Sequence, residues 1–490
     1  MDTCLQLAPK LRRTLLSVPI ATYVNLWYTI PDFVQRTFQR NKTMPLSVNA
    51  IPGPKGLPGV GVAPRLLNDP LDLLLRIHRH YGDLVKLPLG KHTMYLAVHP
   101  DMIKRITQEN WKNYIKQYTT MEDILGQGLV TSNGDHWLRQ RRLIQPAFHH
   151  QRITQMATVM VEEAERMLER WEAYARHRQP VDIQAELMLL AEKIIVRTMF
   201  STSLSDTEAA QVGKAFNDTL NWVAGQQFRL LQPPRSWPTP ANRRYYRNLA
   251  LLEQTVYRLI NERQQRQGEH DDLLEMLVSA RDADTGEPMS SKQIRDEVMT
   301  IFLAGHETTA GTLSWILHLL AHHGDSERKL RAEYAAVLGG RNPTPADLPQ
   351  LTYSRMVIDE TLRLYPPTWL LSRTLVGPDT LGDYDLPAGA IVALSPYVTH
   401  RHPEFWPNAE SFDPERFHPE TVAGRHKFAY VPFLSGPRQC IGNNVALMEM
   451  QMVLPMILQR FHVSAIPGYP VFPVAKATLR PGPRQRYTLI

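Results

Sequence analysis

The sequence is poor in cysteine, with only Cys4 and Cys440 among 490 residues. Two cysteines so far apart exclude a disulfide framework and a cysteine-rich zinc or iron–sulfur site. A reducing compartment such as the cytoplasm is therefore expected. A thiol that does chemistry in this chain does so alone or with a non-protein group.

The sequence also lacks the marks of several other protein classes. No low-complexity tract is present, and no period of about 20–50 residues recurs, which excludes a disordered chain, a solenoid and a propeller. The formal net charge is +7, and the basic residues form no stripe with interleaved aromatic residues, so we expect no nucleic-acid partner. With 43% hydrophobic and 21% charged residues, the chain suits a folded globular protein with a large core.

Near the N-terminus, no stretch reaches the about 20 predominantly apolar residues of a transmembrane helix. Residues 14–31 carry no charge, but Pro19 and Asn25 interrupt their apolar character. One interpretation is that residues 14–31 anchor the chain in a membrane. The other is that residues 1–45 only touch a membrane surface, since Arg36 and its basic neighbours alternate with apolar residues. A transit peptide is a third possibility.

The run from Ile51 to Gly59 is rich in proline and glycine, which prevents helix formation there. We therefore divide the chain into an N-terminal segment, residues 1–50, and a large domain, residues 51–490. Strands are predicted at 84–89 and 93–98, and short β pieces after residue 462. Helical spacing of apolar residues predicts helices at 136–148, 154–177, 183–200, 207–226, 243–266, 292–323, 353–365 and 445–461. The proline-rich stretch 228–242 is predicted to be a loop.

Cys440 lies in a glycine-containing loop directly ahead of the predicted helix at 445–461. Gly436 is expected to adopt a backbone conformation that other residues avoid, and Gly442 leaves room for a flat ligand. Backbone N–H groups and the positive end of the helix dipole favour a thiolate at Cys440. Arg438 is placed to pair with an acidic group of the same ligand. An inert cysteine buried in a tight turn is the alternative.

The fixed positions of this loop match the signature of the cytochrome P450 family. They are Phe433, Gly436, Arg438, Cys440 and Gly442. Leu434 stands where the family often has Gly or Ser, and we interpret that position as permissive. The resemblance spans roughly residues 51–490. It implies a mainly α fold with a minor β part, a long central helix across the haem, and haem b whose iron takes the Cys440 thiolate as axial ligand.

Trp137 and Arg141 are spaced i, i+4 on one predicted helix face. By the resemblance, this pair contacts the haem propionates, which suits an indole N–H and a guanidinium. Arg373, after the Pro366-Pro367 break, is expected to reach a propionate too. On the residues alone, Arg141 covering a half-buried Trp137, and Arg373 in an exposed ion pair, are the alternatives.

Glu307 is the only Asp, Glu, Lys or Arg between Val298 and Ala321. A carboxylate in so apolar a helix is costly unless it is paired or protonated. Gly305 weakens the helix, and Thr308 can bond back to a carbonyl, which together permit a local kink. The resemblance implies that Glu307 and Thr308 relay protons during oxygen activation. A satisfied core glutamate and a helix-bonded threonine are the alternative.

Glu360 and Arg363 share a predicted helix face at i, i+3. In the family the corresponding residues form a buried network with a later arginine, here Arg416. We interpret these three residues as structural.

Several residues near these motifs are candidate walls of a substrate pocket, with ordinary core as the alternative. They are Met121, Ala304, Thr368, Trp369, Leu370 and Leu371. Their mostly apolar character favours a lipophilic substrate such as a fatty acid, terpenoid or steroid.

Together these features predict a haem-dependent monooxygenase that inserts one atom of dioxygen into a lipophilic small molecule, by hydroxylation or epoxidation. The chain after Cys440 is too short for a fused redox domain, and no G-x-G-x-x-G follows a strand. Electrons from NAD(P)H are therefore expected through a separate ferredoxin or flavoprotein reductase. A candidate docking patch for an acidic partner consists of Arg139, Arg142, Arg425 and Lys427, with solvated surface charge as the alternative.

Two other functions fit parts of this pattern. A haem-thiolate peroxygenase or rearrangement enzyme shares the fold, but such members usually lack the acid–alcohol pair seen at 307–308. A non-catalytic haem sensor needs neither a proton relay nor a large apolar pocket. Oxygen consumption that depends on NAD(P)H and a reductase separates both from a monooxygenase.

Overall fold

The computed structural model describes residues 45–490 except 202–205, 228–235, 267, 269–271 and 483–485. The segment 14–31, interpreted above as anchored in or resting on a membrane, lies outside the described residues. Within the described part of the chain, no helix combines the length and the apolar character needed to cross a bilayer.

Helices make up most of the compact unit Ser47–Ile490. Its α-helices are α3 (Ala63–Asn68), α4 (Pro70–Tyr81), α5 (Pro100–Lys104), α6 (Thr119–Leu125), α7 (Gly134–Ile144), α8 (His150–Arg176), α9 (Ile183–Phe200), α10 (Asp206–Gln227), α11 (Pro240–Gln265), α12 (Leu273–Ser279), α13 (Ser291–Leu320), α14 (Gly324–Leu338), α15 (Thr352–Leu364), α16 (Pro396–Thr399), α17 (Pro419–Ala423) and α18 (Asn443–Arg460). The expected mainly α fold is confirmed.

Short strands form the minor β part. They are β1 (Leu84–Leu89), β2 (His92–Ala97), β3 (Tyr114–Ile115), β4 (Val181–Asp182), β5 (Leu371–Leu375), β6 (Asp379–Leu381), β7 (Tyr384–Leu386), β8 (Ile391–Leu394), β9 (Val463–Ala465), β10 (Pro473–Ala475), β11 (Leu479–Pro481) and β12 (Arg486–Leu489). One sheet has the order β1-β2-β8-β5-β3, with β2 and β8 parallel and β5 antiparallel to β8. The hairpin β10-β11 and the sheet β4-β12-β9 involve the C-terminal region.

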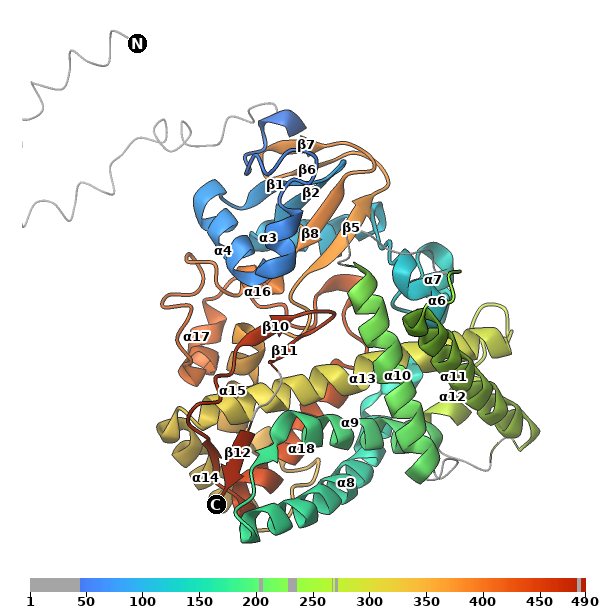
Figure 1. Ribbon diagram of the computed structural model, residues 1–490, viewed down its shortest axis with the longest axis vertical. Helices are drawn as coiled ribbons and strands as arrows, with labels where there is room; N and C mark the ends of the chain where they lie inside the picture. Colours follow the sequence, from blue (N-terminus) through green and yellow to red (C-terminus); the bar gives the residue numbers. More distant parts are fainter. Residues whose placement is uncertain (1–44, 202–205, 228–235, 267, 269–271, 483–485) are drawn as a thin grey trace, which may run out of the picture. The chain divides into compact units, whose positions relative to one another are not determined.

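Helix α13 runs through the middle of this unit, with the main sheet on one side and α8 and α9 on the other (Figure 1). It packs against α9, α11, α15, α18 and β11. The long central helix is thus confirmed, and a capping box at Ser290 and Gln293 fixes its start. The second half of α13 shares a core with α8, α9, α15 and α18. Its first half shares another core with α10, α11 and α12.

Local capping explains where some predicted elements differ from the structure. The predicted loop 228–242 is too long at its C-terminal end, because the Thr239 side chain accepts a hydrogen bond from Asn242 N at 3.1 Å and Pro240 occupies the first turn of α11. Its part 228–235 lies outside the described residues. Helix α4 was not predicted, although Asp69 accepts a hydrogen bond from Asp72 N at 3.3 Å and caps it.

Candidate active site

The loop before α18 is held close against the backbone of the segment that follows α5. Gly436 has a φ of +71°, and a Cβ at this position would lie 1.9 Å from the Thr107 carbonyl oxygen. Only glycine fits, as predicted. Thr107 Oγ1 lies 2.7 Å from Ser435 Oγ, and Cys440 N donates to the Phe433 carbonyl at 3.0 Å. These contacts fix the loop around the cysteine.

Leu434 has a φ of +57°, which is the left-handed region of backbone conformation. A bulky side chain is strained there, whereas glycine is not. The interpretation of this position as permissive is therefore wrong. The half-buried Leu434 packs against a core cluster that includes Val431 and Phe428, and this packing offsets part of the strain.

The Cys440 side chain is free and exposed, although many protein atoms surround it. This burial among protein atoms raises the pKa of the thiol, while the Gly442 backbone N–H and the charge on Arg141 lower it. Gly442 precedes the first residue of α18, as predicted, and the space where its Cβ would stand is open within 4 Å. The Gly442 N–H at the helix end favours the thiolate, as expected, but burial has the larger effect and the net pKa of the thiol is raised. Metal coordination removes this cost by deprotonating a bound thiol.

Cationic side chains gather beside the cysteine loop. Arg141 Nη1 donates to the Gln439 carbonyl at 3.1 Å. Arg438 donates to the Ser132 carbonyl at 3.2 Å, and Arg373 on β5 donates to Tyr118 Oη at 3.2 Å. Burial lowers the pKa of Arg438 to about 10, and repulsion from Arg373 contributes. The structure thus brings together three arginines predicted to bind propionates.

Lys116 joins this group, although the sequence did not point to it. Its Nζ donates to the Leu129 carbonyl at 2.6 Å. Burial lowers its pKa well below the ordinary value, and repulsion from Arg438 and Arg373 adds to the effect. So much positive charge in one buried place favours an anionic ligand.

The residues around the loop fit the haem that the resemblance implies. Arg438 Nε is buried without a hydrogen-bond partner, and the part of the chain that the structure describes supplies no ion pair to Arg141, Arg373 or Arg438. Two carboxylates of a flat ligand would satisfy these cations. Gly442 leaves space beside Cys440 for such a ligand.

Trp137 is buried on α7, and its ring centroid lies 5.6 Å from that of Trp111. The Arg438 guanidinium lies 4.2 Å from the Trp137 ring centroid, within the range of a cation–π contact. Arg438, and not Arg141, therefore covers this tryptophan. Helix α7 places Trp137 and Arg141 beside the cysteine loop, in contact with Arg438 and Gln439 respectively.

Glu307 and Thr308 lie near the middle of α13. Glu307 is 9% exposed, and its Oε1 lies 3.3 Å from Nη1 of Arg480 on β11. The sequence left open whether the buried Glu307 carboxylate is paired or protonated. In the structure it is paired, with Arg480. Thr308 Oγ1 donates to the Ala304 carbonyl at 2.8 Å, as its position predicted. Gly305 permits close packing, since a Cβ there would come 3.0 Å from Ile195 Cδ1 of α9.

Glu360 and Arg363 form a fully buried pair on α15. Arg363 Nε and Nη2 donate to the two Glu360 oxygens at 2.6 and 2.7 Å. Arg416 Nε lies 3.5 Å from Glu360 Oε1, and Asp413 N donates to the same oxygen at 2.9 Å. Arg363 also donates to the Ala409 carbonyl at 2.7 Å. The structure therefore brings the three predicted residues together in one network.

The candidate pocket walls divide into two groups. Trp369 and Leu371 are buried in the cores of the β part, and Trp369 Nε1 donates to the Lys476 carbonyl at 2.9 Å. The geometry favours the core alternative for these two residues. The side chains that remain accessible are Met121, Thr368 and Leu370, all half-buried, and Ala304, which is exposed on α13.

The predicted docking patch does not form a free cationic surface. Arg139 and Arg142 lie 3.6 and 3.5 Å from the Asp282 carboxylate. Arg425 stacks on Trp406 with its guanidinium 4.0 Å from the ring centroid. Internal partners thus already engage three of the four residues, although Arg142 and Lys427 are both exposed.

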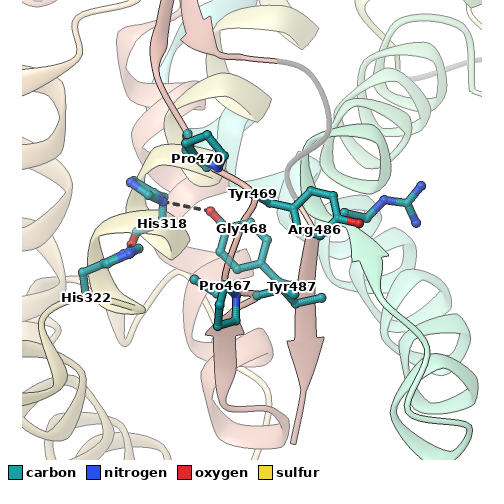
Figure 2. Close-up of a pocket in the computed structure, with 11 residues that line it drawn as sticks. His318, His322, Pro467, Gly468, Tyr469, Pro470, Arg486 and Tyr487 are labelled. Atoms are coloured by element: carbon teal, nitrogen blue, oxygen red, sulfur yellow. Dashed lines mark hydrogen bonds between the residues drawn. The ribbon is translucent and has the colours of Figure 1, made fainter.

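A separate pocket lies at the C-terminal end of α13. It has a volume of about 560 Å³ and lies against the sheet that includes β9 and β12 (Figure 2). His318 Nδ1 and Tyr487 Oη are 2.9 Å apart in its wall. The residues that line it include no residue of the cysteine loop, so this pocket is not part of the candidate site.

Sequence reasoning missed three neighbours of this site: Arg480, Lys116 and Trp111. Arg480 is separated from Glu307 by 173 residues, and no local pattern marks it as a partner. Trp111 begins a short 3-10 helix, and Lys116 directly follows β3. The place of both residues beside α7 depends on tertiary packing.

Comparisons with known proteins agree with this geometry. The sequence profile of the cytochrome P450 family matches residues 51–485. The chain is 37% identical to cyclooctatin synthase of Streptomyces melanosporofaciens, over 92% of this chain and 97% of that protein. It is 36% identical to pentalenene oxygenase of Streptomyces avermitilis, over 87% and 94% of the two chains. Among solved structures, the heme domain of cytochrome P450DA superposes with a TM-score of 0.83 at 27% identity, covering 91% of this chain and 98% of that chain.

Proposed function

The chain belongs to the cytochrome P450 family, and we propose that Cys440 is the axial ligand of its haem. The cations beside the cysteine loop bind the two haem propionates. The protein is an oxidoreductase that incorporates molecular oxygen into a lipophilic small molecule. It carries haem b with a cysteine thiolate ligand and depends on a redox partner.

One observation carries the assignment of this site. Arg141, Arg373, Arg438 and Lys116 gather beside the loop that carries a free cysteine, and Arg438 Nε is a buried donor without a partner. Cations at such a place are stable only if an anion joins them. The two propionates of haem b meet that need, while Gly442 leaves space beside the cysteine.

The residues on α13 supply protons. A haem held by Cys440 would supply the activation of dioxygen, and the thiolate would favour cleavage of the O–O bond. Thr308 holds a hydroxyl proton in its bond to the Ala304 carbonyl and can turn it toward the substrate side. Glu307, an ionised carboxylate beside Arg480, takes up a proton from bulk water and passes it on to replace the one that Thr308 has given. The apolar neighbours on α13 exclude water and direct protons to this route.

The substrate is proposed to be a hydrocarbon-rich small molecule, in keeping with the half-buried Met121 and Leu370 and the exposed Ala304. Relatives are named pentalenene oxygenase and cyclooctat-9-en-7-ol 5-monooxygenase. We expect compounds of those kinds to bind ahead of fatty acids and steroids. Hydroxylation or epoxidation is the expected reaction.

The redox partner is proposed to be a separate ferredoxin or flavoprotein reductase. The catalytic domain is proposed to comprise residues 51–490. Residues 1–50 are proposed to form an N-terminal segment, which touches a membrane surface peripherally through residues 1–45. A cytoplasmic location accompanies this assignment.

The ligand assignment is tested by the spectrum of the reduced, carbon monoxide-treated protein. The native protein should show the long-wavelength Soret band of a thiolate complex, and Cys440→Ala should lose it. Cys4→Ala, which removes the other cysteine, serves as the control and should keep the band. A Cys440→Ala protein with an unaltered spectrum would refute the proposal.

The reaction class is tested by oxygen consumption. We expect consumption that requires NAD(P)H and a reductase and increases when pentalenene is added. Substrate-induced Soret shifts in a panel that contains pentalenene, fatty acids and steroids should rank the substrate classes. Product formation with hydrogen peroxide alone, at a rate equal to that with NAD(P)H and reductase, would favour the peroxygenase.

A further inference from the structure

Four histidines from separate segments converge where α4 ends and β1 begins. They are His78, His99, His402 and His426. The ring centroids of His78 and His402 are 4.9 Å apart, and those of His99 and His402 are 5.7 Å apart. Phe405 contacts three of these rings. Imidazole is among the side chains that zinc prefers, so a cluster of this kind is a candidate metal site.

Three groups within this cluster are arranged to share one ion. Asp83 Oδ1 lies 3.0 Å from His402 Nε2 and 3.6 Å from His78 Nδ1. One ligand atom from each of the three residues lies within 4.8 Å of the others. Ligands at about 2.0–2.1 Å from a tetrahedral zinc ion stand about 3.3 Å apart. Movements of about 1 Å would therefore close the site around an ion.

The other two histidines differ in their surroundings. His426 Nε2 lies 3.2 Å from Asp101 Oδ1, and His99 Nδ1 lies 3.6 Å from Asp101 Oδ2. Asp101 thus engages both rings. His78 and His402 share Asp83 instead, which makes these three residues the metal-binding set.

The burial of the three groups suits a bound ion. The side chains of His78 and His402 are 7% and 6% exposed, whereas that of Asp83 is 34% exposed. Two buried nitrogens form a dry base, and the carboxylate leaves an entry path and room for water as a further ligand.

The hydrogen bonds present around the site are weak enough to be exchanged. His78 Nδ1 lies 3.2 Å from the Gly82 carbonyl oxygen, and Glu404 N lies 3.3 Å from His402 Nδ1. Both exceed the usual length of about 2.9–3.0 Å. Ligation through His402 Nε2 moves the ring proton to Nδ1, so the contact with Glu404 N and the hydrogen bond to Asp83 are both given up. Ligation through His78 Nδ1 gives up the contact with the Gly82 carbonyl. The bonds to the ion replace these three contacts.

We propose that His78, Asp83 and His402 bind one divalent transition-metal ion, with zinc the expected ion and water completing the coordination. The ion would connect the α4–β1 turn to the segment that follows α16. Two nitrogen ligands exclude Mg²⁺ and Ca²⁺, which take oxygen ligands. This site is independent of the haem and of the redox reaction.

The test is titration of the untagged, haem-loaded protein with zinc chloride by isothermal calorimetry, followed by X-ray absorption at the zinc edge. We expect one equivalent to bind, with imidazole nitrogens in the first coordination sphere, and the thermal midpoint to increase with zinc concentration. Magnesium chloride should produce no such increase.

The variants separate this site from adventitious binding. Asp83→Asn preserves the shape of a half-exposed side chain and should weaken zinc binding at least about tenfold, because it removes the only anionic ligand. His402→Asn should abolish binding. The control is His80→Asn, which replaces an exposed histidine on α4, the helix that carries His78. This variant should bind zinc as the native protein does.

Three results would overturn the proposal. They are zinc ligation by oxygen atoms only, an Asp83→Asn variant that binds zinc as tightly as the native protein, and no binding at about 1 mM zinc. A dissociation constant of about 1 mM corresponds to a binding free energy of only about 4 kcal/mol. If His402→Asn does not fold, Asp83→Asn and the absorption spectrum decide the question alone.

Discussion

Arg480 of β11 lies 3.3 Å from Glu307 of α13, measured from Nη1 to Oε1, although 173 residues separate them in the chain. Arg480 Cβ would stand 3.9 Å from a Cβ added at Gly311, one turn further along α13. The hairpin β10-β11 therefore lies directly on the central helix. A strand near the C-terminus thus balances the only charge in the apolar middle of α13.

Arg480→Gln should destabilise the protein by about 1–3 kcal/mol, because the carboxylate of Glu307 then stays buried without its cation. Urea unfolding of the native protein, Arg480→Gln, Glu307→Gln and the double variant forms a double-mutant cycle. We expect the double variant to lose less stability than the sum of the two single losses. Additive losses would show that the two side chains do not interact.

Thr308→Ala should uncouple the reaction. Removing the hydroxyl interrupts proton delivery, so product formed per NAD(P)H should fall about tenfold or more while hydrogen peroxide is released. Thr312→Ala is the matched control, because Thr312 Oγ1 makes the same type of bond, to the Thr308 carbonyl at 2.9 Å. An unchanged product yield in Thr308→Ala would exclude the relay.

Glu360→Ala should lose haem and folding together. Its pair with Arg363 is fully buried, and breaking such a pair costs about 3–5 kcal/mol. The control is Glu415→Ala, which removes the partner of Lys329 in an exposed pair and should cost less than about 1 kcal/mol. Haem content and the urea midpoint are the measurements. A Glu360→Ala protein that keeps its haem and loses only turnover would contradict the structural role.

Leu434→Gly should be tolerated unusually well for the loss of a half-buried leucine. A left-handed backbone conformation destabilises a leucine by about 1–2 kcal/mol. Substitution by glycine removes this strain but also removes the packing of the leucine side chain. We expect a net change within about 1 kcal/mol. Val431→Gly, in the same loop but without a positive φ, should cost about 2–4 kcal/mol. Equal losses in the two variants would show that Leu434 is not strained.

Glu449→Gln should remove a pH dependence of stability. Burial raises the pKa of Glu449 to about 8, and its Oε1 has no hydrogen-bond partner. Between pH of about 4.5 and 8, the folded protein keeps a proton that the unfolded chain has released, so stability falls as pH rises, by at most about 1.4 kcal/mol per pH unit.

In thermal unfolding, the advantage of Glu449→Gln over the native protein should therefore increase from pH 5 to pH 8. A constant difference between the two proteins across this range would show that Glu449 does not hold a proton in the folded state.

Much of the helical part was predictable because each helix carries its own signals. The apolar spacing of 183–200 predicted α9 at its observed bounds, and the apolar run after Lys292 predicted α13 within a few residues. The boundaries that failed depend on single contacts. Thr239 caps α11 from inside the predicted loop, a contact that spacing does not reveal.

The candidate site was predictable only in part. Cys440, Glu307, Thr308 and the Glu360–Arg363 pair belong to local motifs. The structure places Cys440 just before α18, Glu307 and Thr308 on α13, and the Glu360–Arg363 pair inside α15. The candidate docking patch is less free than the sequence suggests, because formal charge in a sequence does not reveal internal partners. Asp282 pairs with Arg139 and Arg142, and Trp406 covers Arg425.

The sequence by itself determined the helices, the cysteine loop and the chemistry of the residues in it, because these depend on spacing and side-chain type over a few turns. Only the tertiary structure decided that Arg480 pairs with Glu307, that Lys116 joins the cations near Cys440, that Leu434 is strained, and that His78, Asp83 and His402 meet. The physical reason is that such relationships arise when distant segments pack, and no local pattern carries that information.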